Sequence, residues 1–151
     1  MNLPISSSQE SSPAQYPDLI IDGLIGCSLR GAPRGRDASL IELANSQTAP
    51  IISLEAPSGV DTTTTAVYSP AIKPSATMTQ VLPKEGLRAP GVEEHLGDLY
   101  LADISVAPDL YADTGLNITI DPFFADTDII RHSGVRCTSQ VRCTWFKSTA
   151  T

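Results

Sequence analysis

The chain has 151 residues, with 17 acidic and 10 basic side chains and a formal charge of −7. Hydrophobic residues make up 41% of it, a share that excludes a disordered chain and is enough to bury one core. No apolar run reaches the roughly 20 residues of a membrane-spanning helix, and the first residues resemble no secretory signal. We therefore expect a cytoplasmic protein that does not enter a membrane and, because its body is acidic, does not bind nucleic acid.

The first half of the sequence predicts a strand, a helix and a second strand. Residues 1–15 are rich in Ser and Pro and predict a disordered lead-in. The continuous apolar runs at 18–22 and 51–55 each end in a carboxylate and are typical of strands covered on both faces. Residues 37–45 read as a helix with one apolar stripe, and they follow a loop rich in Gly and Arg. This βαβ pattern predicts that the two strands are parallel.

The second half predicts further strands separated by loops. Residues 61–75, rich in Thr and Pro, read as a loop, and residues 76–82 as a third strand. Residues 98–104 alternate in part, which places a fourth strand nearer an edge, and residues 116–120 are a candidate fifth strand.

The composition changes near residue 133. We predict one domain over 16–132 and an unstructured tail over 133–151, which holds three basic side chains and no acid. Cys137 and Cys143 lie in a short repeat of this tail, but no second Cys or His pair follows at zinc spacing, so a metal site is not favoured. With Cys27 the cysteine count is three, which does not form a disulfide framework.

Two carboxylates stand where ligands bind in parallel α/β sheets, at the carboxyl ends of strands. Asp22 and Glu55 each end an apolar run, and each is followed by a turn of small residues that would let a ligand approach the backbone. Arg30, Arg34 and Arg36 lie in the first of these loops and suit phosphate groups. The alternative, with equal weight, is that the acids cap turns and the arginines are solvated.

Several segments, in order along the chain, carry a resemblance to a known family. They are Asp-Leu-Ile-Ile-Asp-Gly-Leu-Ile-Gly-Cys-Ser-Leu-Arg-Gly at 18–31, Ser-Leu-Ile-Glu at 39–42, Leu-Glu-Ala-Pro-Ser-Gly-Val-Asp at 54–61, Pro-Lys-Glu-Gly-Leu at 83–87 and Gly-Asp-Leu-Tyr-Leu-Ala-Asp-Ile at 97–104. Together they resemble the second half of the YjeF N-terminal domain, the NAD(P)H-hydrate epimerase family, over about residues 18–108.

The resemblance implies a Rossmann-like three-layer αβα domain with a mainly parallel sheet, here without the N-terminal part of the domain. It also implies an activity, the interconversion of the R and S epimers of hydrated NADH or NADPH. A partner dehydratase would then restore the nucleotide, and a homodimer is a further possible assembly.

The resemblance also implies roles for individual residues. Asp22 and Ser58 would help to hold one potassium ion per subunit, a hard cation that prefers oxygen ligands. Glu55 would contact the dinucleotide and act as the catalytic carboxylate in proton transfer. The other residues that would contact the dinucleotide are Gly26, Cys27, Ser28, Leu29, Arg30, Gly31 and Ala32.

Two departures from the family leave an alternative open. Position 55 carries Glu where the family usually has Asp, and the family's Gly/Asn-rich nucleotide loop has no counterpart in the sequence. The alternative function is a non-catalytic binding or scaffold module of this family, or an inactive fragment.

Five other polar residues are interpreted structurally. We predict a solvated Lys84, a turn or helix cap at Asp61, a structural or supporting Asp103, a surface His95 and a packing role for Cys27.

Overall fold

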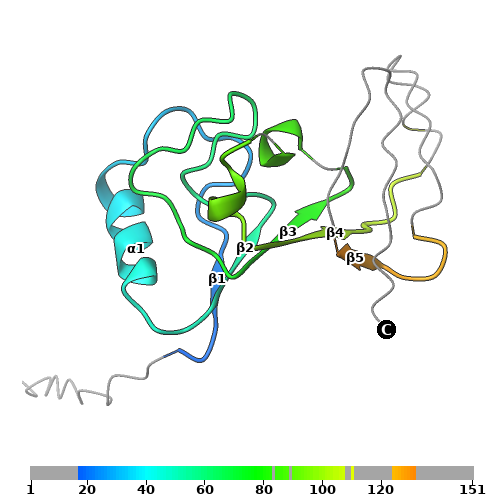
Figure 1. The fold of residues 1–151 in the computed structure, drawn as a ribbon, viewed down its shortest axis with the longest axis horizontal. Coiled ribbons are helices and arrows are strands. Elements are labelled where there is room, and N and C mark those ends of the chain that lie inside the picture. Colours follow the sequence, from blue (N-terminus) through cyan, green and yellow to red (C-terminus); the bar gives the residue numbers. More distant parts are fainter. Residues whose placement is uncertain (1–16, 83, 89, 108–109, 111–123, 132–151) are drawn as a thin grey trace, which may run out of the picture.

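The computed structural model describes residues 17–82, 84–88, 90–107, 110 and 124–131 (Figure 1). In this part of the chain the elements are β1 (Ile20–Asp22), α1 (Gly35–Asn45), β2 (Ile51–Leu54), β3 (Ala76–Gln80), the 3₁₀ turns η1 (Glu85–Arg88) and η2 (Glu93–His95), β4 (Asp98–Ala102) and β5 (Ile129–Arg131). None of the described helices combines the length and the hydropathy that crossing a membrane requires.

The five strands form one sheet in the order β1-β2-β3-β4-β5 (Figure 1). The first four are parallel, and β5 pairs antiparallel with β4. The predicted parallel pairing across the βαβ unit is therefore confirmed, and the carboxyl ends of β1 and β2 meet at one edge of the sheet. The register sets Asp22 beside Ser53 and Ser53 beside Thr77, so three polar residues stand in one row across the strands.

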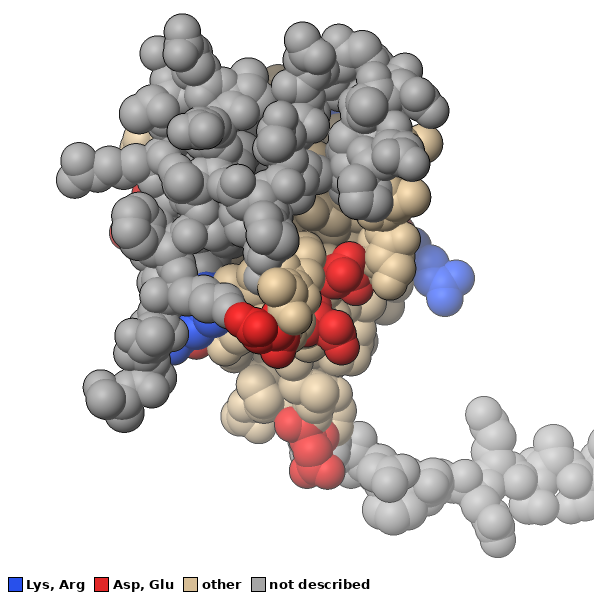
Figure 2. Space-filling model, turned by 90° about the vertical axis from the view of Figure 1, so that its right-hand side faces the viewer, with Lys and Arg blue, Asp and Glu red and all other residues tan. Residues whose placement is uncertain are grey.

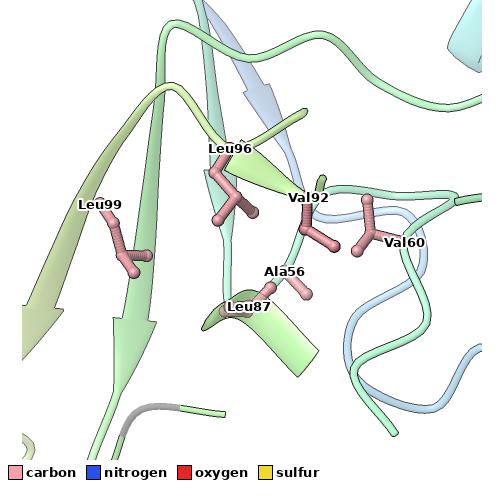
Figure 3. Packing of buried hydrophobic residues seen from close by; sticks show 6 residues of the cluster. All are labelled: Ala56, Val60, Leu87, Val92, Leu96 and Leu99. Carbon is pink, nitrogen blue, oxygen red and sulfur yellow. The ribbon is translucent and has the colours of Figure 1, made fainter. Parts of the chain in front are cut away.

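One face of the sheet is covered by two hydrophobic clusters. Beside α1, Ile41 packs with Ile51 of β2 and with Ile72 of the loop that follows residue 60. The second cluster joins β4 to the turn after β2 and to the segments around η1 and η2 (Figure 3), and consists of Ala56, Val60, Leu87, Val92, Leu96 and Leu99. The helix and both 3₁₀ turns thus contribute to a single layer on this face.

The opposite face of the sheet is more open. The strand residues that face this side, including Ile52, Met78 and Tyr100, are only half-buried. Ile21 of β1 is 53% exposed. Continuous apolar runs predict strands covered on both faces, but no described helix packs on this side. The described residues therefore form two layers of the three that the resemblance implied.

Acidic side chains gather on the side of the molecule that carries β4 and β5 (Figure 2). The exposed acids of these strands and their flanks are Asp98, Asp103, Asp126 and Asp128. Asp98 of β4 and Arg131 of β5 form an ion pair, with 2.6 Å between Oδ1 and Nη2. This side of the described surface is therefore mainly acidic.

Most element positions agree with the sequence predictions, and the differences are at the ends. The helix begins two residues earlier than predicted, so Arg36 lies in α1 and not in the preceding loop. The four parallel strands are each one to two residues shorter than predicted. Strand β5 was missed because three residues are too few to show a pattern. The predicted strand at 116–120, the lead-in, the tail and its two cysteines lie outside the described residues.

Candidate functional site

The carboxylate of Asp22 is the centre of a buried hydrogen-bond network at the end of β1. Asp22 is only 2% exposed. Oδ1 accepts from Ser58 Oγ at 2.6 Å and from the Leu24 amide at 3.3 Å, and Oδ2 accepts from Ser53 Oγ at 2.8 Å and from the Ser58 amide at 2.9 Å. Four donors offset the desolvation of this buried charge.

The turn Pro57-Ser58-Gly59 brings two of these donors to Asp22. The Val60 amide donates to the Pro57 carbonyl at 2.9 Å and closes the turn. Gly59 has a φ of 105°, and a Cβ there would lie 2.6 Å from Ala71 Cα. Only glycine fits this position, which orients the amide and the hydroxyl of Ser58 toward the end of β1.

The loop after β1 is attached to the same centre. The Ile25 amide donates to Ser58 Oγ at 3.0 Å. A Cβ built on Gly26 would lie 3.9 Å from Cβ of Glu55, so the loop passes directly beside the end of β2. The structure therefore brings together Asp22, Ser58, Glu55 and the start of the loop that was predicted to contact a dinucleotide.

Glu55 follows β2 in a left-handed backbone conformation, with a φ of 66°. Its amide donates to the Met78 carbonyl at 2.9 Å, which continues the contact with β3. Its Oε2 atom lies 2.7 Å from Nζ of Lys84, and that ammonium also donates to the Gln80 carbonyl at 2.8 Å. The backbone strain of a non-glycine residue at positive φ is a feature that clusters at functional sites.

Lys84 differs from the sequence prediction of a solvated lysine. Its side chain is 24% exposed and that of Glu55 27% exposed, so the ion pair is half-buried. The sequence feature that could have pointed to this role is the place of Lys84 in the segment Pro-Lys-Glu-Gly. Only the tertiary structure shows that this loop reaches the end of β2. Ser53 is a second residue that sequence reasoning missed, and its signal was a polar residue inside an apolar strand.

The predicted dinucleotide loop surrounds two hollows. One, of about 520 Å³, is lined by loop residues that include Ser28, Arg30 and Arg34. The other, of about 310 Å³, lies between Cys27 and Arg30 on one side and the turn beginning at Asp61 on the other. Glu55 lines neither hollow, although the loop passes beside it.

Asp61 caps the turn that follows, as predicted. Its Oδ1 atom accepts hydrogen bonds from the Thr64 and Thr63 amides at 2.9 and 2.8 Å. These bonds lower the pKa of the Asp61 carboxyl below its ordinary value, since they favour the charged form. Asp103 likewise has a structural role, because its Oδ1 atom accepts from the Ser105 amide at 2.7 Å.

The predicted packing role of Cys27 is wrong, because Cys27 is exposed. His95, which was predicted to lie on the surface, is half-buried at the end of η2.

The oxygen atoms near Asp22 match the chemistry of a hard monovalent cation. Ser58 Oγ lies 2.6 Å from Asp22 Oδ1 and 3.5 Å from the Ile25 carbonyl oxygen. The hydroxyl donates to the carboxylate and accepts from one amide, which leaves it a further lone pair. A carboxylate and neutral oxygens are the ligand type that a hard cation prefers.

Comparison with known proteins places this arrangement in a family. The model of the YjeF-related protein N-terminus matches residues 1–86, more than half of the chain. The chain belongs to the YjeF-related family. The matched residues include the ends of β1 and β2, with Asp22, Glu55 and Ser58.

Several YjeF-related relatives have names that state an activity. The chain is 40% identical over 108 residues to a protein of Dehalogenimonas lykanthroporepellens named NAD(P)H-hydrate epimerase, covering 72% of this chain and 42% of the relative. A protein of the same name from Truepera radiovictrix is 33% identical over 82% of this chain and 53% of its own length. A bifunctional NAD(P)H-hydrate repair enzyme Nnr of Pyrobaculum aerophilum is 34% identical over 62% of this chain and 19% of its own. The chain thus spans about half or less of these relatives.

A solved structure shares the fold. The crystal structure of yeast ynu0 superposes with a TM-score of 0.57 at 20% sequence identity, over 76% of this chain and 46% of the yeast chain. At this identity the likeness supports the α/β fold with its mainly parallel sheet.

Proposed function

We propose that this chain contributes to the epimerisation of the R and S forms of hydrated NADH and NADPH. The observation that carries the proposal is that Asp22, Ser58 and Glu55 lie close together at the carboxyl ends of β1 and β2, beside the loop that follows β1. Membership of the YjeF-related family and the names of the epimerase relatives support the same reaction.

Glu55 is the proposed catalytic residue. Inverting a carbon that bears a hydroxyl group beside a ring nitrogen requires proton transfer, and a carboxylate can accept and return that proton. The left-handed backbone at Glu55 and the 2.7 Å ion pair with Lys84 together restrict where its carboxylate can point. Lys84 is therefore a positioning residue in this proposal.

The loop Gly26–Ala32 would hold the nucleotide. Arg30 and Arg34 line its larger hollow, and guanidinium groups form paired hydrogen bonds with phosphates. Glycines at 26 and 31 let a ligand come close to the backbone. The link from the Ile25 amide to Ser58 Oγ fixes the start of this loop relative to Glu55.

Asp22 and Ser58, with the Ile25 carbonyl, are the proposed ligands of one potassium ion per subunit. A bound potassium ion would supply positive charge next to the nucleotide loop. Asp22 balances that charge, and Ser58 joins the site to the loop through the Ile25 amide.

The product of the reaction suggests the partner. Epimerisation alone does not restore NADH or NADPH, so a dehydratase must remove the water. The Pyrobaculum aerophilum relative is named as a bifunctional repair enzyme, which supports a dehydratase as the partner of this chain. We place the reaction in the cytoplasm and allow for a homodimer.

A coupled assay tests the proposal. The chain is incubated with R-NAD(P)H hydrate and an S-specific dehydratase, with and without potassium, and recovery of NAD(P)H is followed by absorbance. We expect recovery with the original chain to be faster than spontaneous epimerisation. In E55Q the protein-catalysed rate should be about a hundredfold lower than in the original chain. The matched control E42Q changes an exposed carboxylate of α1 and should retain the rate. Recovery no faster than without protein would contradict catalysis by this chain.

A second candidate is a binding module without catalysis. It is favoured by the ion pair that engages Glu55 and by the absence of Glu55 from the lining of both loop hollows. Calorimetric binding of NADH hydrate that is lost in R30Q, together with no acceleration in the coupled assay, would support this candidate over the enzyme.

A further inference from the structure

Strand β2 ends in an unusual turn centred on Glu55. The Ala56 amide donates a hydrogen bond to the Leu54 carbonyl at 2.8 Å, and Glu55 between them has a φ of 66°. An amide bonded to the carbonyl two residues earlier, across a residue of positive φ, defines the rarer and more strained type of γ-turn. The extended backbone of β2 therefore stops at the carboxylate residue that the proposed reaction uses.

Strand β3, the neighbour of β2, ends in the same type of turn, centred on Val81. The Leu82 amide donates to the Gln80 carbonyl at 2.7 Å, and Val81 has a φ of 64°. A β-branched residue rarely adopts a positive φ, and such a backbone persists only where the contacts around it hold it in place. One of these contacts comes from Val81 itself, whose amide donates to the Ala102 carbonyl of β4 at 3.2 Å.

Lys84 joins the two turns. Its Nζ atom lies 2.7 Å from Oε2 of Glu55 and donates to the Gln80 carbonyl at 2.8 Å. The same carbonyl accepts the Leu82 amide, so the ammonium binds the oxygen that closes the Val81 turn. Because the ion pair is half-buried, water and salt screen it less than they would an exposed pair. Each turn thus supplies one oxygen to the same ammonium group.

The backbone that follows Lys84 is anchored independently. The Leu87 amide donates to the Lys84 carbonyl and the Gly86 amide to the Thr62 carbonyl, both at 3.0 Å. A Cβ at Gly86 would collide with that Thr62 carbonyl, so the two segments are in close contact. Leu87 is 2% exposed and belongs to the second hydrophobic cluster (Figure 3). With this side fixed, the direction of the Lys84 side chain depends on the turn at Val81.

We propose that the turns at Glu55 and Val81, linked through Lys84, set the direction of the Glu55 carboxylate, and that Val81 is a positioning residue for the reaction proposed above. The Val81 turn directs the Gln80 carbonyl to Lys84, and Lys84 then holds Oε2 of Glu55. A displacement of about 1 Å in a reacting group can lower a rate about a hundredfold, which explains why a strained valine is useful here. The inference rests on the proposed function for the use of Glu55, whereas the linkage of the two turns is a property of the chain without substrate.

Hydrogen exchange of the chain without substrate tests the linkage. Coupling between two parts of a protein is reciprocal, so loss of the lysine should loosen both turns. In K84M we expect the Ala56 and Leu82 amides to exchange about fivefold faster or more. K73M is the matched control, because Lys73 is exposed, and it should leave both exchange rates unchanged. Any result other than acceleration of both amides in K84M alone would overturn the proposal.

Amine labelling tests the role of Val81. V81P excludes a positive φ, whereas V81G allows it without strain. The rate at which acetic anhydride modifies Lys84, relative to exposed Lys73 of the same chain, is measured by mass spectrometry. We expect this relative rate to rise about fivefold in V81P, because the ion pair no longer protects Lys84, and to stay at its original value in V81G.

S105P is the control for this labelling. Ser105 also has a positive φ, at 59°, and its amide also donates a hydrogen bond, to Asp103 Oδ1 at 2.7 Å. It follows β4 and should not affect Lys84. No change at Lys84 in V81P, or an equal change in S105P, would overturn the role of Val81. Thermal unfolding verifies that each variant is folded, and the exchange experiment on K84M decides the linkage even where V81P does not fold.

The coupled assay separates positioning from binding. V81P should lower kcat about tenfold or more with little change in KM, and V81G should restore most of that loss. A higher KM with an unchanged kcat would contradict a positioning role. Absence of activity in the original chain would refute the proposed function, whereas the exchange and labelling results would still decide whether the two turns are linked.

Discussion

Ser58 Oγ donates a 2.6 Å hydrogen bond to Oδ1 of Asp22, although the two residues are 36 positions apart in the chain. The bond joins the end of β1 to the turn after β2. The same hydroxyl accepts from the Ile25 amide, so the loop after β1 depends on it as well. This one contact therefore connects the stability of the sheet edge with the position of the proposed nucleotide loop.

Replacing Asp22 by Asn should destabilise the fold. The amide keeps the size of the carboxylate but places an NH₂ group where Ser53, Ser58 or Leu24 donates. We expect a loss of about 2–3 kcal/mol in the free energy of unfolding, measured by urea titration. D18N, which changes an exposed acid near the same strand, should leave the stability within about 0.5 kcal/mol of the original. Equal values for the two variants would contradict the network.

The two serines that donate to Asp22 should differ in their effect on the loop. S58A removes both the donor to Asp22 and the acceptor for the Ile25 amide, whereas S53A removes a donor only. Hydrogen exchange at Ile25 should therefore accelerate by about tenfold in S58A and change little in S53A. Similar exchange in both variants would show that Ser58 does not hold the loop.

Alanine at Gly59 should cost more stability than alanine at Gly31. Both glycines have positive φ, at 105° and 78°. A Cβ at Gly59 would meet Ala71 Cα at 2.6 Å, whereas nothing lies within 4 Å of a Cβ at Gly31. We expect G31A to lose about 1 kcal/mol from backbone strain and G59A about 3 kcal/mol or more, since overpacking adds to strain. Thermal unfolding measures both, and a smaller loss in G59A would refute the close packing of this turn.

Asp61 should make stability depend on pH in the acid range. Its pKa is lowered in the folded protein by the Thr64 and Thr63 amides, so the stabilisation is complete above its ordinary value of 3.8. It is lost as the pH falls through the lower folded pKa. The NMR titration of the Asp61 carboxyl should show a midpoint below 3.8, and D61N should flatten the dependence. A midpoint at or above the ordinary value would contradict the cap.

Potassium should raise the thermal stability of the chain if Asp22 and Ser58 hold the ion. A cation that binds the folded form alone stabilises it by mass action. The melting temperature should therefore be higher in potassium chloride than in choline chloride at equal ionic strength, and the difference should vanish in S58A. A difference that persists in S58A would place the effect elsewhere. The measurement does not require activity.

Much of the architecture follows from local pattern. The apolar run before Asp22, the helix ending near Asn45 and the run before Glu55 predicted a βαβ unit, and the structure contains it. The role of Asp61 as a turn cap was also predicted, because a carboxylate and the amides two and three residues later are neighbours in the chain. Such features depend on contacts over a few residues.

The rest depends on residues that are distant in sequence. The pairing of Lys84 with Glu55 requires the loop after β3 to return to the end of β2, and no local pattern shows that return. Ser53 looked like one polar residue in an apolar strand until the register set it beside Asp22. Cys27 was misplaced for the same reason, since exposure is decided by what packs above a residue.

Length, composition and charge by themselves determined that this chain can bury one core and that its body is acidic. The ordered motifs determined the family, because short segments with fixed spacing are specific without coordinates. Only the tertiary structure decided which acids and hydroxyls touch. It also decided that Ile21 of β1 stays exposed, because burial is a property of the whole packed chain.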